Sequence, residues 1–124
     1  MSEEKAIYRC PECGLIIEVL NPGADPVCCA LPMLLMKENT SDGAKEKHVP
    51  AAENFNGKLK VKVGSTAHPM TKEHYIMWIE VRVGSMLYRK ELFPDELPEA
   101  VFDIPYSDSA EIREYCNLHG LWRK

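Results

Sequence analysis

Apolar and polar residues alternate with the two-residue period of a β-strand in several short segments of the chain. Leu59, Val61 and Val63 alternate with lysines at positions 58, 60 and 62. Successive side chains of a strand point to opposite faces, so 58–63 is predicted as a half-buried strand with a basic outer face. These lysines are expected to form a solvated strand face rather than to steer a ligand.

The segment 75–83 repeats this alternation and is predicted as a second strand. Its apolar face consists of Tyr75, Met77, Ile79, Val81 and Val83, and its other face carries Glu80 and Arg82. Gly84-Ser85 predicts a turn into 86–92, which makes the two segments a hairpin. Further strands are expected at 101–104 and 112–116. Short strands separated by proline and glycine turns predict a small antiparallel β-sandwich.

The first 37 residues have a different pattern, with four of the five cysteines among short apolar stretches. Strands are predicted at 7–9 and 15–20, a turn at 21–26, and a third apolar stretch at 31–36. A domain of ~40 residues normally needs a metal or disulfides to fold. Residues 37–56 are polar and are predicted to be a linker or surface loop. The sequence therefore predicts two domains, 1–37 and 38–124.

Composition and charge exclude some classes of function. The net charge of −4 among 124 residues argues against a nucleic-acid partner, which calls for a basic surface. No apolar run approaches the ~20 residues of a membrane span, so no membrane partner is expected. The N-terminus is acidic and is followed by no long apolar core, so we expect no secretory signal and a reducing, cytoplasmic location.

The cysteines predict a metal site in the first domain. The chain has five, at positions 10, 13, 28, 29 and 116, and an odd number does not suit a closed disulfide framework. A C-x-x-C pair places two thiolates on one metal, and a second pair completes a tetrahedron. Neighbouring residues of a strand point apart, so Cys28 and Cys29 can reach one metal only if the backbone bends. Four thiolates suit zinc and iron alike, so the pattern leaves a structural zinc knuckle and an iron centre both open.

The histidines predict a second site in the other domain. All four histidines, at 48, 68, 74 and 119, share that domain with Cys116, and Cys116 and His119 form a C-x-x-H pair. A tetrahedral zinc site would leave one histidine over. Four nitrogens and one sulfur suit a square pyramid, whose open position a catalyst needs and a structural site avoids. An axial thiolate would donate electron density to iron, as in thiolate-ligated haem.

At these residues the sequence resembles the desulfoferrodoxin family, nearly from end to end. The motifs that carry the resemblance are Tyr8–Gly14 (YRCPECG), Cys28–Met33 (CCALPM), Ser41–Pro50 (SDGAKEKHVP), His68–Met70 (HPM), His74–Ile79 (HYIMWI) and Glu114–Gly120 (EYCNLHG). Together they are far more specific than any one metal-binding spacing, and no predicted ligand position departs from the family pattern.

The resemblance implies an all-β protein with a small desulforedoxin-like metal knuckle followed by an immunoglobulin-like antiparallel β-sandwich. It implies two irons per chain. An Fe(Cys)4 centre would be held by Cys10, Cys13, Cys28 and Cys29, and an Fe(His)4(Cys) centre by His48, His68, His74, Cys116 and His119. It also implies superoxide reductase activity, the one-electron reduction of superoxide to hydrogen peroxide without oxygen release, with a rubredoxin-like electron donor and a homodimeric assembly.

Two charged residues beside His48 take their expected roles from the same resemblance. Lys47 is adjacent to a ligand, so its ammonium could reach the open face, attract superoxide and orient a water for proton delivery. Glu46 is the family's candidate sixth ligand of the ferric resting state. For the first centre, an electron store and a purely structural role both remain open. Trp78, Tyr115 and Trp122 are expected to be core or dimer contacts.

Overall fold

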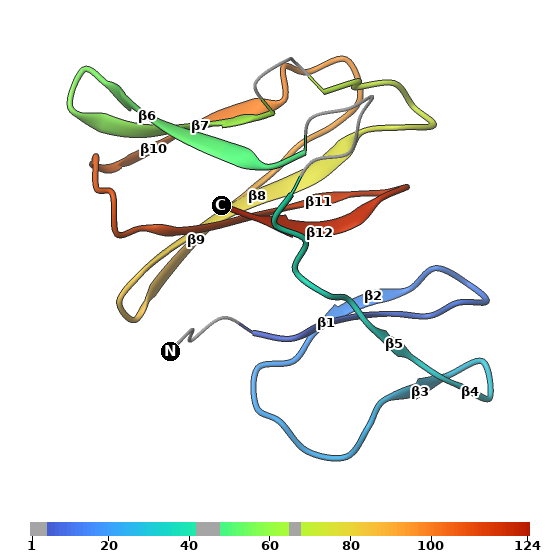
Figure 1. Cartoon of the computed structure of the whole chain (residues 1–124). Coiled ribbons are helices and arrows are strands. Elements are labelled where there is room, and N and C mark those ends of the chain that lie inside the picture. Colours follow the sequence, from blue (N-terminus) through green and yellow to red (C-terminus); the bar gives the residue numbers. More distant parts are fainter. Residues whose placement is uncertain (1–4, 42–47, 65–67) are drawn as a thin grey trace. The chain divides into compact units, whose positions relative to one another are not determined.

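The computed structural model describes residues 5–41, 48–64 and 68–124. The chain divides into two compact units, Met1–Lys37 and Glu38–Lys124 (Figure 1). Every regular element of the described residues is a β-strand, and all paired strands are antiparallel. The predicted all-β fold class is therefore confirmed. Within the described ranges, no helix is long and apolar enough to cross a membrane.

The first unit contains two very small sheets. β1 (Ile7–Arg9) lies between β2 (Ile16–Glu18) and β5 (Leu34–Leu35) in a three-stranded sheet. β3 (Val27–Cys28) and β4 (Leu31–Pro32) form a two-stranded hairpin. The predicted strands at 7–9 and 15–20 are present, and the third apolar stretch is divided between β4 and β5.

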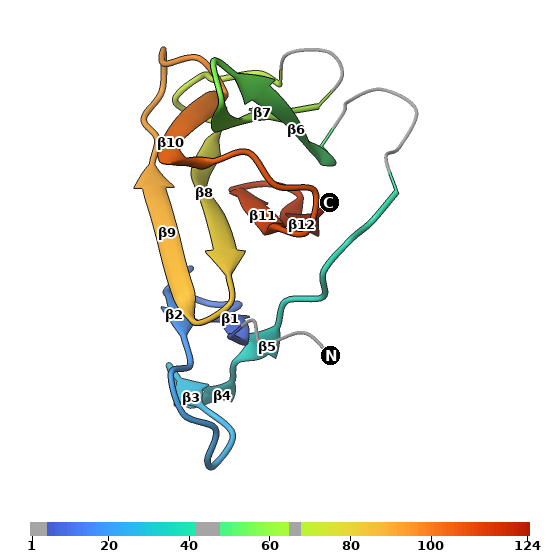
Figure 2. The same cartoon turned by 90° about the vertical axis from the view of Figure 1, so that its left-hand side faces the viewer.

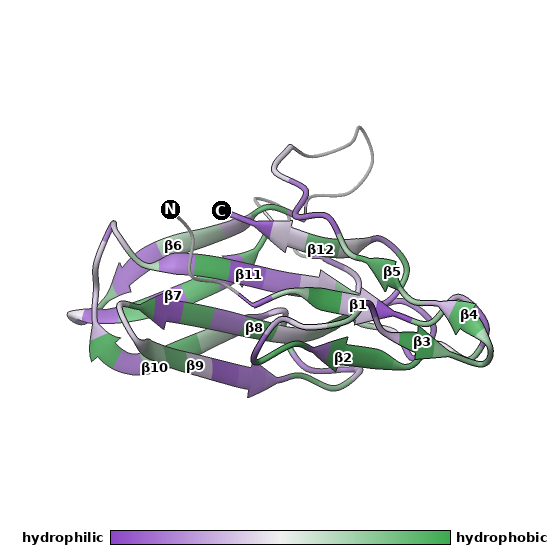
Figure 3. Ribbon diagram, turned by 90° about the horizontal axis from the view of Figure 1, so that it is seen from below, coloured by the Kyte–Doolittle hydropathy of each residue, from purple (hydrophilic) through white to green (hydrophobic). Residues whose placement is uncertain are grey.

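Apolar burial in this unit is slight. Ile7, Cys10 and Met33 are its buried apolar residues among those described, whereas Leu20 and Val27 are 71% and 67% exposed. Figure 3 shows hydrophobic residues along β2, β4 and β5. A unit with so small a core depends on other interactions for its stability, which agrees with the metal knuckle expected from its cysteines.

The second unit is a sandwich of two antiparallel sheets (Figure 2). One sheet has the order β10-β7-β6 and the other β12-β11-β8-β9. The strands are β6 (Pro50–Phe55), β7 (Lys58–Val63), β8 (Ile76–Val83), β9 (Met86–Glu91), β10 (Glu99–Pro105), β11 (Glu111–Cys116) and β12 (Gly120–Arg123). Side chains of both sheets share one core, in which Leu59, Val61 and Val63 pack with Ile79, Val81 and Ile112.

One strand lies where the sequence predicted a linker or loop. Within 37–56, the segment Pro50–Phe55 forms β6 and pairs with β7 along its whole length. Its composition is a poor strand signal, and pairing with the strongly alternating β7 overrides it. The turn between them is Asn56-Gly57, with φ of 52° and 89°. Asn-Gly is the preferred two-residue hairpin turn, so this dipeptide was the signal for the missed strand.

The alternation predicted for 75–83 holds at Ile79 and Val81 and breaks at both ends, since Val83, predicted on the apolar face, is 39% exposed. Ile76 is fully buried and Met77 is half-buried, although the prediction had placed Met77 on the apolar face. The register explains this difference, because Tyr115 pairs with Trp78 whereas Cys116 pairs with Ile76. This β-bulge changes which side chains face inward at the end of the strand where the histidines gather.

The basic face predicted for β7 is neutralised by acidic residues of its neighbours. Lys60 lies 3.8 Å from Glu53 on β6 and 3.4 Å from Glu99 on β10. Lys58 lies 3.1 Å from Asp103 on β10. This face is therefore a ladder of cross-strand ion pairs, which gives no basic surface to steer an anion.

Candidate metal centres

The loop after β1 gathers the first two cysteine sulfurs. Cys10 donates its amide to the Leu15 carbonyl at 2.8 Å, and Gly14 donates its amide to the Cys10 carbonyl at 3.1 Å. Gly14 has a φ of 80°, a conformation that glycine adopts without strain. The tight loop places the amide of Cys13 3.4 Å from Cys10 Sγ. Both side chains of the C-x-x-C pair therefore face the same point.

The backbone bends at the adjacent pair Cys28-Cys29, as it must if both sulfurs are to reach one metal. Cys28 ends β3, and Cys29 and Ala30 have φ of 54° and 59°. Because Cys28 pairs with Leu31, these two residues form a two-residue hairpin turn with both φ values positive, the pattern of a type I′ turn. Such values are uncommon for residues other than glycine. The turn brings the two neighbouring sulfurs to the same side, 3.8 Å apart.

The four cysteine sulfurs lie at the spacing of a tetrahedral metal site. Cys13 Sγ is 3.6 Å from Cys28 Sγ, and all four sulfurs lie within 4.8 Å of one another. Metal–sulfur bonds of about 2.3 Å at tetrahedral angles separate the sulfurs by about 3.8 Å. All four cysteines are free thiols. The donor set and its dimensions therefore fit one metal ion, with Cys10 buried and Cys13 and Cys29 at the surface.

Hydrogen bonding divides the thiols by pKa. The hydrogen bond from the Cys13 amide to Cys10 Sγ lowers the pKa of Cys10 to about 6. Side-chain hydrogen bonding with Cys10 raises the pKa of Cys28 to about 12, and hydrogen bonding with Cys13 raises that of Cys29. In the metal-free cluster Cys10 is thus a thiolate at neutral pH, whereas Cys28 and Cys29 keep protons that a metal must displace.

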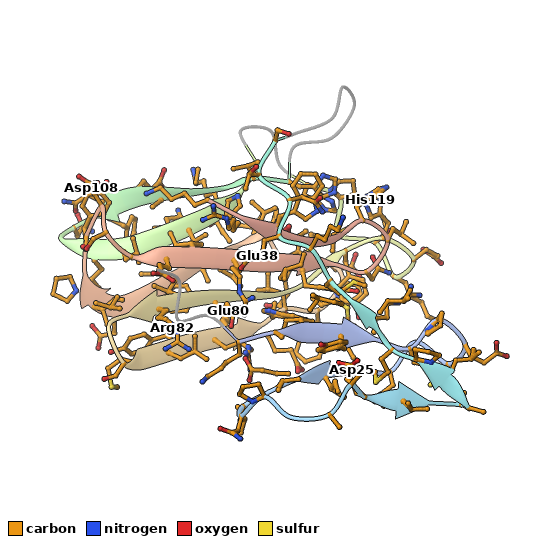
Figure 4. All side chains as sticks on the ribbon, turned by 60° about the horizontal axis from the view of Figure 1, so that its bottom comes forward. Asp25, Glu38, Glu80, Arg82, Asp108 and His119 are labelled. Carbon is orange, nitrogen blue, oxygen red and sulfur yellow. The ribbon has the colours of Figure 1, made fainter. Side chains whose placement is uncertain are left out.

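The second candidate centre draws on the ends of both sheets. His48 lies two residues before β6, and His74 lies two residues before β8. His68 lies in the connection between β7 and β8, Cys116 is the last residue of β11, and His119 lies in the turn to β12. Strand pairing therefore brings together residues that are far apart in sequence. Figure 4 shows His119 at one end of the sandwich.

The distances between donor atoms fit a common metal ion. His48 Nε2 lies 3.0 Å from His68 Nε2 and 3.2 Å from His119 Nδ1. Cys116 Sγ lies 3.6 Å from His68 Nε2 and 3.7 Å from His119 Nδ1. All five donors lie within 4.8 Å of one another, those of His74 included. Two nitrogens bound to one metal at right angles, each at ~2.1 Å, are separated by about 3.0 Å.

The four imidazoles form a closed ring of edge-to-face contacts. The centroid of His48 lies 4.6 Å from that of His68 and 4.9 Å from that of His119, and the centroid of His74 lies 4.7 and 5.1 Å from the same two. The interplanar angles lie between 64° and 83°. His48 and His74 are therefore opposite each other, as are His68 and His119.

Burial leaves the cluster open on one side. Cys116, His68 and His48 are 0%, 3% and 4% exposed. His74 is half-buried and His119 is exposed. Among the five ligands, His119 is therefore the one at the surface, while the sulfur of Cys116 lies in the interior. His68 Nδ1 lies 2.7 Å from the Pro69 carbonyl oxygen. A carbonyl only accepts hydrogen bonds, so Nδ1 donates and the lone pair of Nε2 faces the cluster.

The structure brings all nine sequence-predicted ligands into these two clusters. Glu46 and Lys47, the two charged residues predicted to act beside His48, lie outside the described residues. Trp122 was expected to be a core or dimer contact, and it is buried, but its ring stacks on His48. Trp78 and Tyr115 stack on each other, with centroids 4.8 Å apart.

The fold and the two donor sets define a two-centre, all-β metalloprotein. The desulfoferrodoxin family model matches residues 40–124, and the model of the desulfoferrodoxin N-terminal domain matches residues 2–36. The chain belongs to the desulfoferrodoxin family. Its four-cysteine cluster and its histidine–cysteine cluster fit the two iron centres of that family.

Individual relatives match between 71% and 99% of the chain. A desulfoferrodoxin of Nitratidesulfovibrio vulgaris is 53% identical over 124 residues, which cover 99% of this chain and 98% of the relative. A superoxide reductase of Pyrococcus horikoshii is 34% identical and covers 71% of this chain and 94% of its own. The crystal structure of the superoxide reductase from Treponema pallidum superposes with a TM-score of 0.75 at 32% identity, covering 99% of both chains.

Proposed function

We propose that this protein is a superoxide reductase, which reduces superoxide to hydrogen peroxide at iron held by its histidine–cysteine cluster. The overall reaction takes one superoxide, one electron and two protons and yields one hydrogen peroxide. The observation that carries the proposal is the donor set itself, four imidazole nitrogens and one thiolate sulfur within 4.8 Å of one another. The similarity to superoxide reductases over the whole second unit supports it.

The histidine and cysteine ligands have different roles in the proposed site. His48, His68, His74 and His119 supply neutral imidazoles, and Cys116 supplies the thiolate. Iron held by these five residues would supply one electron to superoxide. The buried position of Cys116 keeps its sulfur away from water and oxidants, and the exposed side at His119 admits a small anion.

Lys47 and Glu46 take the remaining roles in the proposal, on the basis of the family resemblance. Lys47 is adjacent to His48 in the sequence, so its ammonium is proposed to attract superoxide and to orient a water that delivers protons. Glu46 is proposed to close the site in the ferric resting state, as its sixth ligand. Each role can be tested without altering any of the five histidine and cysteine ligands.

The second iron is proposed to lie among Cys10, Cys13, Cys28 and Cys29. The spacing of their sulfurs supports this assignment, as does the small core of the first unit. The electron donor is proposed to be a rubredoxin-like one-electron carrier. A homodimer is proposed as well, and the exposed Leu20, Val27 and Leu35 of the first unit favour an apolar contact there.

The test is metal content, visible spectrum and superoxide consumption measured on the same preparation. We expect two irons per chain and stoichiometric hydrogen peroxide without oxygen release. Cys116→Ser and His119→Ala are expected to abolish superoxide reduction. A colourless protein with two zinc ions per chain would replace the proposal with a structural module. Unchanged activity in both variants would show that the histidine–cysteine cluster is not the site of the reaction, and the protein would then be an electron carrier.

A further inference from the structure

His74 lies in the connection between β7 and β8, whose described part from 68 to 75 contains no helix or strand. The turn that carries it is closed by its own hydrogen bonds. Thr71 donates its amide to the His74 carbonyl at 2.9 Å, and His74 donates its amide to the Thr71 carbonyl at 3.2 Å. Such local bonds fix the shape of the turn. They do not fix its distance from His48, Cys116 and His119, which lie on different segments.

The side chain of Asn117 ties this turn to the rest of the cluster. Its Oδ1 accepts the Tyr75 amide at 2.9 Å, and its Nδ2 donates to the Glu73 carbonyl at 3.0 Å. The two bonded residues flank His74 on either side. The amide of Asn117 also donates to the Tyr75 carbonyl at 3.2 Å. Three hydrogen bonds thus join the His74 segment to the turn that carries Cys116 and His119.

Asparagine suits this position chemically. The Tyr75 amide needs an acceptor and the Glu73 carbonyl needs a donor, and a carboxamide presents one of each. Aspartate would keep the acceptor but set a carboxylate oxygen against the Glu73 carbonyl. Alanine would remove both bonds. Since Asn117 directly follows Cys116, its position is fixed by the end of β11.

We infer that Asn117 is a positioning residue, which holds the imidazole of His74 at binding distance from a metal shared with Cys116 and His119. The inference rests on the five-ligand site of the proposed function. Asn117 touches neither substrate nor metal in this role. It acts through the backbone on both sides of His74, and its loss frees one of the four imidazoles.

The experiment uses the full chain loaded with cobalt(II), wild type and Asn117→Ala. A histidine bound to cobalt shows a paramagnetically shifted ring N–H signal that disappears in D₂O, whereas cysteine ligands give no such signal. Cobalt in the four-cysteine cluster therefore does not interfere. We expect four exchangeable signals in the wild type and three in Asn117→Ala, the same three that remain in His74→Ala. Affinity measured by chelator competition should fall roughly 10- to 100-fold.

The controls separate positioning from general stability. Asn54→Ala removes a comparable bond, from the Gly57 amide to Asn54 Oδ1 at 2.7 Å, in a hairpin that supplies no ligand. It should keep all four signals. Asn117→Asp has a side chain of the same size and keeps the bond from the Tyr75 amide. It replaces Asn117→Ala in the experiment if that variant does not fold, and it should also lose the His74 signal.

Each outcome decides something. Four signals and wild-type affinity in a folded Asn117→Ala or Asn117→Asp would overturn the inference. Cobalt-shifted ring signals from fewer than four histidines in the wild type, with non-exchangeable ring C–H protons counted as well as N–H protons, would overturn the five-ligand site, and with it both proposals. Four signals in the wild type without superoxide reduction would end the proposed function and leave the role of Asn117 intact.

Discussion

The indole of Trp122 lies flat against the imidazole of His48, with ring centroids 4.5 Å apart and an interplanar angle of 12°. The same indole donates its Nε1 hydrogen to the carbonyl oxygen of His119 at 3.1 Å. One buried side chain of β12 therefore restrains two candidate ligands, one through its ring and the other through its backbone. Residues that orient the ligands of a metal site in this way commonly affect metal affinity.

Substitution of Trp122 should separate these two contacts. Trp122→Phe keeps a flat ring and loses the hydrogen bond, whereas Trp122→Leu loses both. We expect metal affinity to fall ~10- to 100-fold in Trp122→Leu and less in Trp122→Phe. Trp78→Phe is the matched control. The ring of Trp78 stacks on Tyr115 and not, among the described residues, on a histidine ligand. Equal affinities in all three variants, measured by chelator competition, would contradict this prediction.

Loss of one cysteine should affect the two centres unequally. Cys13→Ser removes a ligand of the four-cysteine cluster, and the donors of the histidine–cysteine cluster belong to the other unit. We expect the absorption of the first centre to bleach while the rate of superoxide reduction stays near that of the wild type. The measurement is visible absorption together with pulse radiolysis. Loss of activity with the second iron fully retained would show that the centres are not independent.

A buried ion pair in the second unit should govern stability rather than metal binding. Arg113 Nε contacts Glu80 Oε1, and both side chains are almost fully buried. Figure 4 shows Glu80 away from the cluster that contains His119. Glu80 also pairs with Arg89 at 2.9 Å, and Arg113 keeps a second partner in Glu38 at 3.2 Å. Glu80→Ala therefore leaves the buried guanidinium of Arg113 only partly compensated and should lower the free energy of unfolding by up to about 3–5 kcal/mol.

The control for this variant is an exposed ion pair of the same unit. Lys58 and Asp103 lie 3.1 Å apart, with side chains 53% and 91% exposed. Asp103→Asn should cost no more than about 1 kcal/mol in denaturant unfolding. Metal content should be unchanged in both variants. A Glu80→Ala protein as stable as Asp103→Asn would show that the buried pair contributes little.

Metal binding by the four-cysteine cluster should strengthen as the pH rises. Cys28, with its pKa raised to about 12, and Cys29, with a raised pKa, are protonated at neutral pH and must release protons when metal binds. Because Cys10, with a pKa of about 6, is already ionised at pH 7, it adds to this dependence only below about pH 6. Each proton released makes the affinity rise about tenfold per pH unit, so release from Cys28 and Cys29 alone makes it rise by at least roughly 100-fold per pH unit near neutrality. Chelator competition between about pH 6.5 and 8 measures this slope, and a pH-independent affinity would refute the prediction.

Lys47 should affect the rate of encounter with superoxide. Lys47→Ala removes a positive charge next to a ligand and leaves the donor set complete. We expect a slower second-order rate constant for superoxide and a weaker dependence of that constant on ionic strength, because steering by a charge is screened by salt. Lys58→Ala, in the ion-paired ladder of β7, is the control and should change neither quantity. An unchanged rate constant in Lys47→Ala would remove the steering role.

Strand prediction succeeded where the local pattern was strong and failed where pairing decided the structure. The alternation of β7 was sufficient by itself, because every second side chain enters the core. β6 was missed because its residues become a strand only by pairing with β7. The bulge between Cys116 and Ile76 depends on two strands at once, so no single segment could reveal it.

The sequence by itself determined the donor residues of the two sites, because cysteine and histidine at these spacings are scarce and specific donors, and its resemblance to a family supplied the iron and the reaction. It also determined that the first site needs a bent backbone at Cys28 and Cys29. Only the tertiary structure decided which imidazoles are opposite each other, that Trp122 stacks on His48, and that Asn117 holds the residues flanking His74. The contacts of Trp122 with His48 and of Asn117 with Tyr75 join segments that are distant in sequence, and strand pairing across the sandwich sets their distances.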